Sequence, residues 1–351
     1  MPDLHVGLLY GGQSAEHDVS ILSAKNVRAA LGDRHRVTAI YITRDGRWLV
    51  GDSARLGADT EAGTAATFTP EGGASTVSAS GLGALGLDVV FPVLHGHNGE
   101  DGTIQGFLHT LGIPFVGPDV LASAACMDKV VAKRILEAAG IPGTPYAVVH
   151  AHGERPSFET LTQRLTPPLF VKPANSGSSV GITRVTEAGA LSEAFDVAFR
   201  YDKTVLVEQG VSGREIEVAV LGNERPEASV PGEIVLTSEY YDYDSKYEDP
   251  DASRMEVPAD LHDDVAERIR EVAVEAYAAL GCEGLSRVDF FVTGGGDVLV
   301  NEINTIPGFT ARSMYPVMWE QTGRPFPDVV DELIRLALAR HERDRQRKTT
   351  R

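Results

Sequence analysis

Short apolar runs alternate with a helical pattern in the first third of the chain. The runs predict strands at residues 5–10, 37–42 and 89–94. The first run ends at Gly11-Gly12, and Ser14 can cap a following helix. The apolar residues of that helix recur about every 3.6 positions: Val19, Leu22, Val27, Ala30 and Leu31. Strands that alternate with helices indicate a parallel α/β sheet, whose ligands bind at the carboxyl ends of the strands.

The pattern changes after residue 126. A helix at residues 129–139 precedes apolar runs that predict strands at residues 169–172, 180–185, 205–209 and 216–221. Because short loops rather than long helices separate these runs, we expect antiparallel sheets. The clearest helical pattern covers residues 264–280, with Gly281 as its C-terminal cap, and two strands at 285–292 and 298–303 flank three glycines.

These patterns predict an α/β fold, α+β overall, with three domains. An N-terminal parallel α/β domain is expected at residues 1–126, and α+β domains with antiparallel sheets are expected at 127–213 and 214–351. Residues 57–83 are rich in Ala, Thr, Gly and Ser and predict a surface excursion between strands. The mostly charged segment from Arg340 onward predicts a frayed helix end.

Charge and cysteine content exclude several function classes. The 351 residues contain 32 Lys and Arg against 50 Asp and Glu, a net charge of −18, which disfavours nucleic-acid and anionic-membrane partners. Cys126 and Cys282 are too few for a disulfide framework and suit a reducing cytoplasm. We find neither a secretion signal nor an apolar run of about 18 residues, so a cytoplasmic protein is expected.

Two carboxylates are predicted to meet across the hairpin that contains the three glycines. If the turn spans residues 294–297, Thr293 pairs with Val298, and counting back places Asp289 opposite Glu302, within about 5 Å. Like charges at this separation repel each other. A divalent cation would resolve the repulsion, whereas the alternative is a solvated hairpin face with both carboxylates in water.

Period-2 alternation adds two polar side chains to this hairpin. Arg287 shares a face with Asp289, and Asn304 shares a face with Glu302, Val298 and Val300. Carboxylate and amide oxygens suit Mg²⁺, which takes its remaining ligands from water and nucleotide phosphates. The set therefore predicts a magnesium site formed by Asp289, Glu302 and Asn304.

A glycine- and serine-rich loop at residues 172–181 joins two predicted strands. It is not a Walker A loop, yet its backbone N–H groups and hydroxyls can close over phosphates, with Lys172 supplying charge. A plain serine-rich turn is the alternative. Together with the predicted metal site, the loop favours a nucleoside triphosphate. Glu208 and Glu215 bracket a break between strands that is suited to a flat base or to an ordinary surface loop.

Two further segments allow more than one interpretation. His95, His97, Glu100 and Asp101 can be interpreted as metal ligands, but a glycine-rich loop at a strand end fits them better. The polar, tyrosine-rich residues 238–247 suit either an ordered lid or a surface loop.

Taken in order, these motifs resemble the D-alanine:D-alanine ligases of the ATP-grasp superfamily over nearly the whole chain. The matching segments are Gly11-Gly12-Gln13-Ser14-Ala15-Glu16, His95-Gly96, Gly99-Glu100-Asp101-Gly102, Met127-Asp128-Lys129, the 172–181 loop, residues 241–247, Arg287-Val288-Asp289, Glu302-Ile303-Asn304-Thr305 and Pro307-Gly308. The chain departs from the family in the 57–83 insertion and at Gln209, where the family usually carries Lys or another residue beside the adenine.

The resemblance implies a reaction and a set of roles. One D-alanine carboxylate attacks the γ-phosphate of ATP, and the amine of a second D-alanine attacks the resulting acyl phosphate, giving D-alanyl-D-alanine for peptidoglycan precursors. The implied catalytic residues are Glu16, Ser178, Tyr247, Arg287 and Gly308, and the substrate-binding residues are His95, Tyr241, Ser313 and Met314. The implied ATP-binding residues are Lys129, Lys172, Ser179, Glu208, Gln209, Val211, Glu215, Lys246 and Asn301, and the metal ligands are Asp289, Glu302 and Asn304.

The resemblance also implies cofactors and partners. ATP and Mg²⁺ are expected, with Mn²⁺ as a substitute and a monovalent cation as a further candidate. Two D-alanine molecules and a second copy of the chain, as a homodimer, are the expected partners. A ligase that makes D-alanyl-D-lactate or another dipeptide, and a non-catalytic nucleotide or amino-acid sensor on the same fold, are the alternatives.

Overall fold

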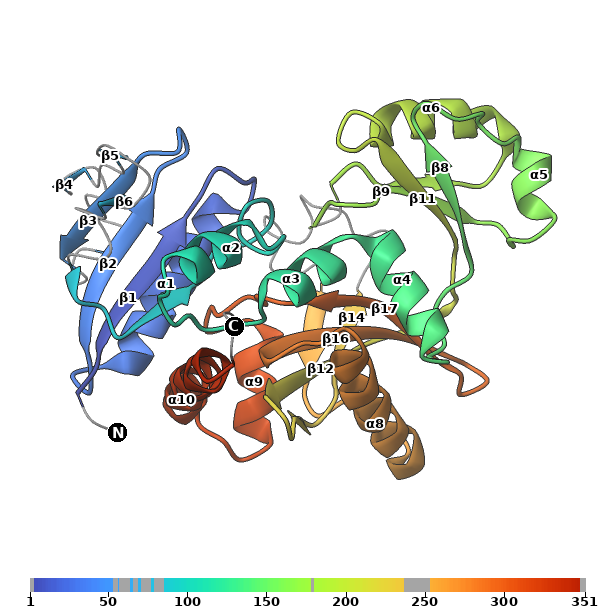
Figure 1. Ribbon diagram of the computed structural model, residues 1–351. Coiled ribbons are helices and arrows are strands. Elements are labelled where there is room, and N and C mark those ends of the chain that lie inside the picture. The colour runs from blue at the N-terminus through green and yellow to red at the C-terminus, as the bar shows by residue number, and fades with distance from the viewer. Residues whose placement is uncertain are drawn as a thin grey trace.

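The computed structural model describes residues 3–52, 56, 64–65, 69–70, 77–78, 85–177, 180–236 and 253–347. Three larger sheets dominate these residues, and a two-stranded ribbon of β5 (Thr69–Pro70) and β6 (Val77–Ser78) lies beside the first. Figure 1 shows the first sheet in blue, the central sheet in green and the last sheet in yellow to brown. The sheets follow the three residue ranges expected for domains, except that the last sheet begins one residue early, at Gly213, and the domain boundaries stay a prediction.

The first sheet has the order β4-β3-β2-β1-β7. Its strands are β1 (His5–Gly11), β2 (Arg36–Ile42), β3 (Trp48–Asp52), β4 (Thr64–Ala65) and β7 (Val89–Pro92). Strand β1 pairs in parallel with both β2 and β7, which confirms the predicted parallel sheet, and β3 adds an antiparallel edge. Helices α1 (His17–Leu31) and α2 (Thr103–Thr110) pack against this sheet through buried apolar side chains.

Helix α1 differs from its prediction in its start and in its buried face. Glu16, not Ser14, is the N-cap residue, and the Ser14 hydroxyl donates to the His95 carbonyl at 2.7 Å. Leu22 is 53 % exposed, whereas Ser20 and Ser23 are buried. The Ser20 hydroxyl accepts from the Gly11 N–H at 2.8 Å and donates to the carbonyl of Val93, the residue after β7, at 2.6 Å. The buried face carries hydroxyls because backbone groups at the strand ends need partners there.

The central sheet is antiparallel, as predicted, in the order β10-β9-β11-β8. Its strands are β8 (Tyr146–His150), β9 (Leu169–Pro173), β10 (Thr183–Val185) and β11 (Thr204–Gln209). The sequence analysis missed two helices here, α5 (Phe158–Thr162) and α6 (Ala188–Ala198), which cover one face of the sheet through Leu161, Leu191 and Phe195. Strand β10 begins at Thr183, so the preceding loop is longer than expected.

The last sheet is also antiparallel, in the order β15-β14-β12-β16-β17, with β13 paired to β12. Its strands are β12 (Gly213–Gly222), β13 (Glu227–Ala228), β14 (Gly232–Leu236), β15 (Ser253–Glu256), β16 (Gly284–Thr293) and β17 (Val298–Asn304). Helix α8 (Asp263–Ala279) packs on one face, as predicted. Gly281 follows it with φ +69°, a left-handed conformation suited to a helix C-terminus.

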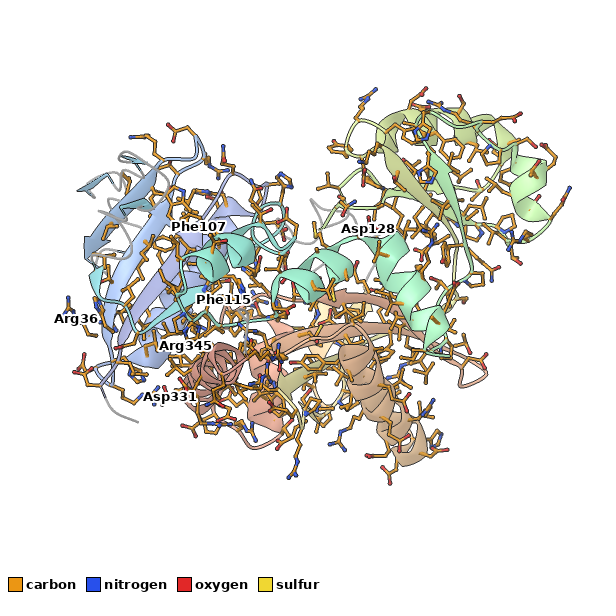
Figure 2. All side chains as sticks on the ribbon, viewed as in Figure 1. Arg36, Phe107, Phe115, Asp128, Asp331 and Arg345 are labelled. Atoms are coloured by element: carbon orange, nitrogen blue, oxygen red, sulfur yellow. The ribbon has the colours of Figure 1, made fainter. Side chains whose placement is uncertain are left out.

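Helices α3 (Val120–Met127) and α4 (Lys129–Ala138) connect the first sheet to the central sheet. Helices α9 (Met314–Gln321) and α10 (Phe326–Arg345) follow the last strand. Helices α9 and α10 share one hydrophobic core with the first sheet and with β12. Arg340 on α10 is buried and donates to the carbonyls of Gly117 and Phe115, and Figure 2 shows Phe115 between the first sheet and α10. The expectation of a frayed helix end is therefore wrong for residues 340–345, and residues 348–351 lie outside the described part of the chain.

No helix among the residues that the structure describes is both long and apolar enough to cross a lipid bilayer.

Candidate active site

The hairpin β16–β17 brings the predicted carboxylates together. Asp289 pairs with Glu302 and Arg287 pairs with Asn304, as expected. The turn, however, pairs Val292 rather than Thr293 with Val298. A β-bulge after Val300 then inserts one extra residue into β17, Asn301, which restores the expected register at Asp289.

The bulge also corrects which side chains share a face. Val298, Val300 and Ile303 pack into the hydrophobic cluster beneath α8, so Glu302 and Asn304 do not share a face with Val298 and Val300. One extra residue inverts the alternation of a strand, and this inversion separates the apolar residues from the polar ones. Glu302 and Asn304 therefore lie on the face opposite to Val298, Val300 and Ile303.

Arg287 lies at the centre of this polar face. Its Nε donates to Asp289 Oδ1 at 2.7 Å, and its Nη2 donates to Asp289 Oδ2 at 2.6 Å. Asn304 Nδ2 donates to the same Oδ2 at 2.9 Å. Glu217 on β12, opposite Asp289 in the register, places Oε2 3.0 Å from Arg287 Nε. Burial by itself would lower the pKa of Arg287, but Asp289 and Glu217 outweigh burial and raise that pKa well above its ordinary value.

The sequence analysis missed Glu217, although a signal for it exists. Acidic residues at 215 and 217 alternate with Ile216 and Val218, the period-2 pattern of a strand with one polar face. Its role depends on the pairing of β12 with β16, strands that lie more than sixty residues apart in the chain. Pattern alone does not give that pairing.

The donor set fits a divalent cation that also binds a ligand's phosphates. Asp289, Glu302 and Asn304 offer two carboxylates and one amide on a single face, which suits Mg²⁺ or Mn²⁺. Within the described part of the chain, no three His, Cys, Asp or Glu side chains gather as a metal cluster. Two carboxylates and an amide, each giving one oxygen, leave half the positions of an octahedral ion to water and to phosphate oxygens.

A second cluster of charges lies inside the central sheet. Glu208 is 2 % exposed, lies 2.5 Å from Lys133 Nζ, accepts from the Thr144 hydroxyl at 2.7 Å and forms an ion pair with Lys172. Burial by itself would raise the pKa of Glu208, but Lys172 and Lys133 outweigh it and lower the pKa to about 2. Burial lowers the pKa of Lys133. The sequence analysis did not identify Lys133 as a site residue.

Lys129 links the hairpin to the glycine- and serine-rich loop. Its Nζ lies 3.6 Å from Glu302 Oε2 and donates to the Ser176 carbonyl. Asp128, the N-cap of α4 in Figure 2, accepts from Asn175 Nδ2 at 3.3 Å. The loop also lies close to Glu16, the N-cap residue of α1. A Cβ atom at Gly177 would lie 3.5 Å from Glu16 Oε2.

A buried polar network supports the first sheet's side of the site. His95 bonds through Nδ1 to the Ile306 carbonyl and through Nε2 to the Ser23 hydroxyl, each at 3.0 Å, and burial lowers its pKa. Glu100 accepts from the Gly96 N–H at 2.6 Å and from the Ile306 N–H at 3.3 Å. Burial, followed by the charge of Glu16, raises the pKa of Glu100 to about 8.

These contacts do not support the alternative of a metal site at residues 95–101. His97 is 78 % exposed and lies 3.3 Å from Asp101, while both ring nitrogens of His95 bond within the protein. The described residues contain no metal cluster at this loop. The network instead links the loop after β7 to the segment after β17.

The remaining predicted residues occupy separate places around this centre. Ser313 Oγ accepts from the Thr310 N–H at 3.0 Å and lies so close to Gly308 that a Cβ there would approach it to 2.7 Å. The side chain of Met314 is buried in the hydrophobic core. Gln209 accepts from the Thr166 N–H at 2.9 Å, and Glu215 pairs across the strands with Phe291.

Val211 lies in the connection between β11 and β12. The other predicted residues lie outside the described part of the chain: Ser178, Ser179, Tyr241, Lys246 and Tyr247. Their roles stay predictions.

The fold and the site define an ATP-grasp ligase. An N-terminal α/β sheet is followed by two antiparallel sheets. The ion pair of Lys172 with Glu208 lies in the central sheet, and Lys129 on α4 pairs with Glu302 on the last sheet. The family model for the "D-ala D-ala ligase N-terminus" matches residues 5–118, and the model for the "D-ala D-ala ligase C-terminus" matches residues 135–335. The chain belongs to the D-alanine–D-alanine ligase family, a family of ATP-dependent ligases.

Named relatives and solved structures agree with this assignment. The chain is 46 % identical to D-alanine–D-alanine ligase A of Escherichia coli K12, over 100 % of both chains. It superposes on the D-alanine-D-alanine ligase of Coxiella burnetii with a TM-score of 0.86 and 38 % identity, covering 99 % of this chain and 97 % of that one. VanG D-Ala:D-Ser ligase of Enterococcus faecalis gives a TM-score of 0.83 and 36 % identity, covering 95 % and 99 %.

Proposed function

We propose that the protein joins two D-alanine molecules into D-alanyl-D-alanine with hydrolysis of ATP to ADP and phosphate. The observation that carries the proposal is the single polar face of β16 and β17, where Arg287, Asp289 and Glu302 lie within reach of Lys129. Phosphoryl transfer between two anions requires concentrated positive charge, and this face supplies it beside carboxylates that can hold a cation.

The nucleotide binds between the central and last sheets. Lys129 and Lys172 attract its phosphates, and Glu208 holds Lys172 in place from beneath. Asp289, Glu302 and Asn304 hold Mg²⁺, or Mn²⁺ in its place, and the cation when bound neutralises charge on the phosphate oxygens. Ser179, Gln209, Val211, Glu215, Lys246 and Asn301 complete the proposed nucleotide site.

The two amino acids bind between the first sheet and the hairpin. Glu16 holds the ammonium of the first D-alanine, with Ser178 and Tyr247 linking Glu16 to the proposed lid. The carboxylate of this D-alanine attacks the γ-phosphate, and the resulting acyl phosphate is a reactive carbonyl compound with phosphate as its leaving group. His95 and its buried partners hold the surrounding backbone rigid.

The second D-alanine attacks that carbonyl through its amine. Arg287 and Ser313 bind its carboxylate, with Tyr241 lining the proposed pocket and Met314 supporting Ser313 from the core. Arg287 and the Gly308 N–H donate to the oxyanion of the tetrahedral intermediate. Phosphate then leaves, and the peptide bond remains.

The proposal extends to organisation and location. We propose substrate binding by residues 1–126, a central nucleotide-binding unit at 127–213, and a unit at 214–351 that holds the cation and the lid. A cytoplasmic homodimer is the proposed state, with a monovalent cation as a candidate activator. The two cysteines, both buried as free thiols, suit a reducing compartment.

The decisive experiment measures ADP release and product mass with ATP, Mg²⁺ and a panel of second substrates. We expect D-alanine alone to give one ADP per dipeptide and to exceed both D-lactate and D-serine. D-serine is included because VanG, a structural neighbour, is named for it. A preference for D-lactate or D-serine would replace the proposed product, and nucleotide binding without turnover would favour a sensor.

A further inference from the structure

Arg287 stands between two buried carboxylates, those of Asp289 and Glu217. Nε carries a single hydrogen, which goes to Asp289 Oδ1 at 2.7 Å. Glu217 Oε2 lies 3.0 Å from the same Nε. The side chains of Arg287 and Glu217 are 15 % and 7 % exposed, so water compensates little of their charge. Glu217 is thus a second acceptor next to an arginine that is bound to Asp289.

The proposed function gives Asp289 two incompatible partners. Both of its oxygens accept from Arg287, and Oδ2 also accepts from Asn304. A divalent cation on Asp289 repels the guanidinium and competes with these donors for the lone pairs of one carboxylate. Cation binding must therefore displace Arg287, at least in part. A buried guanidinium left without a carboxylate is costly, so it needs another anionic partner nearby.

We propose that Glu217 is a positioning residue that takes over the guanidinium of Arg287 when Asp289 binds the divalent cation. Glu217 faces Asp289 across β12 and β16, so a small shift of the guanidinium exchanges one carboxylate for the other. Arg287 thereby stays on the reacting face, where it is available to the oxyanion. The inference rests on the proposed function, because it requires the cation site at Asp289.

The test is a double-mutant cycle on Mn²⁺ affinity, read from the free Mn²⁺ signal in electron paramagnetic resonance. The full-length protein is saturated with adenylyl imidodiphosphate and compared with Glu217→Gln, Arg287→Gln and the double variant. We expect Glu217→Gln to weaken Mn²⁺ binding about tenfold, the effect of losing one charge-assisted hydrogen bond. In the Arg287→Gln background the same substitution should weaken binding by less than half that factor.

The cycle separates a role through Arg287 from simple attraction between Glu217 and the cation. Simple attraction would persist without Arg287, so an equal loss in both backgrounds overturns the proposal. A loss of less than twofold in Glu217→Gln alone also overturns it. If the unaltered protein binds no Mn²⁺ with the nucleotide, the proposed cation site itself is wrong, and this outcome is distinct from a failed cycle.

Glu233→Gln is the matched control. Glu233 belongs to the same sheet, is 8 % exposed and accepts from Arg214 Nε at 2.8 Å, but it pairs with Ile216 and so lies on the opposite face. We expect Mn²⁺ affinity within twofold of the unaltered protein.

A measurement on the unaltered protein covers the case in which Glu217→Gln does not fold. The ¹⁵N resonance of Arg287 Nε, assigned by its absence in Arg287→Gln, should shift when Mg²⁺ is added to the nucleotide-saturated protein. An unchanged resonance at saturating Mg²⁺ means that Arg287 keeps its partner, and this result overturns the proposal.

Discussion

Replacing Glu208 by Gln should destabilise the protein by about 3 kcal/mol, the value indicated by burial and charge at this position. Glu208 lies 2.5 Å from Lys133 Nζ, forms an ion pair with Lys172 and accepts from Thr144. Gln keeps the shape and one acceptor but removes the charge. Two lysines whose side chains are only 5 % and 13 % exposed then lose their counter-ion.

Two estimates of the magnitude agree. The pKa of Glu208 falls from 4.5 to about 2 in the folded protein, and at about 1.4 kcal/mol per factor of ten this change corresponds to about 3 kcal/mol. Removing one partner of a buried ion pair independently costs about 3 to 5 kcal/mol. At about 2 to 4 °C per kcal/mol, the range for domains of about 150 to 250 residues, the melting temperature should fall by about 6 °C or more.

The pH dependence has a defined sign. Because folding lowers the pKa of this carboxyl, its stabilisation is fully present above pH 4.5 and is lost as the pH falls toward about 2. The unaltered protein and Glu208→Gln should therefore differ most at neutral pH and converge in acid.

Urea unfolding followed by circular dichroism, at pH 7 and at several acidic pH values, measures both effects. Asp196→Asn is the control, because Asp196 on α6 beside the central sheet also forms an ion pair, with Arg155 at 2.8 Å, but is 58 % exposed. This substitution should cost less than about 0.5 kcal/mol. A loss below about 1 kcal/mol for Glu208→Gln at pH 7, or a difference that does not shrink in acid, would refute the reasoning.

Three further predictions concern the site. Glu302→Gln should nearly abolish ADP release while circular dichroism stays unchanged, because one proposed ligand charge is lost without a change of shape; normal turnover at saturating Mg²⁺ would contradict the proposed site. Folding raises the pKa of Glu100 to about 8, so its contribution to the free energy of unfolding is lost as the pH rises from 4.5 to about 8. Glu100→Gln should therefore reduce the decrease in stability over this pH range, and unfolding midpoints measured across the range decide it. Tyr247→Phe should raise the ratio of D-alanyl-D-lactate to dipeptide in mass-spectrometric product analysis, and an unmoved ratio would remove Tyr247 from substrate selection.

Local patterns predicted much of the framework and part of the site. The parallel character of the first sheet, the antiparallel character of the other sheets and helix α8 were all predicted and are confirmed. The pairing of Asp289 with Glu302 was predicted because both strands of a hairpin lie close in sequence. That prediction succeeded although its turn was displaced by one residue, since the bulge at Asn301 compensates.

The sequence by itself determined the residue types and the short-range geometry: strands, helix periods, acidic charge, and the carboxylates of one hairpin. Only the tertiary structure decided which distant groups share a buried environment, because low exposure and close charges arise when separate strands pair. Glu217 meets Arg287 only through the pairing of β12 with β16, and Glu208 meets Lys133 only where α4 packs beside the central sheet. Burial then fixes which of these groups carry charge, since an ion removed from water persists only beside a partner of opposite sign.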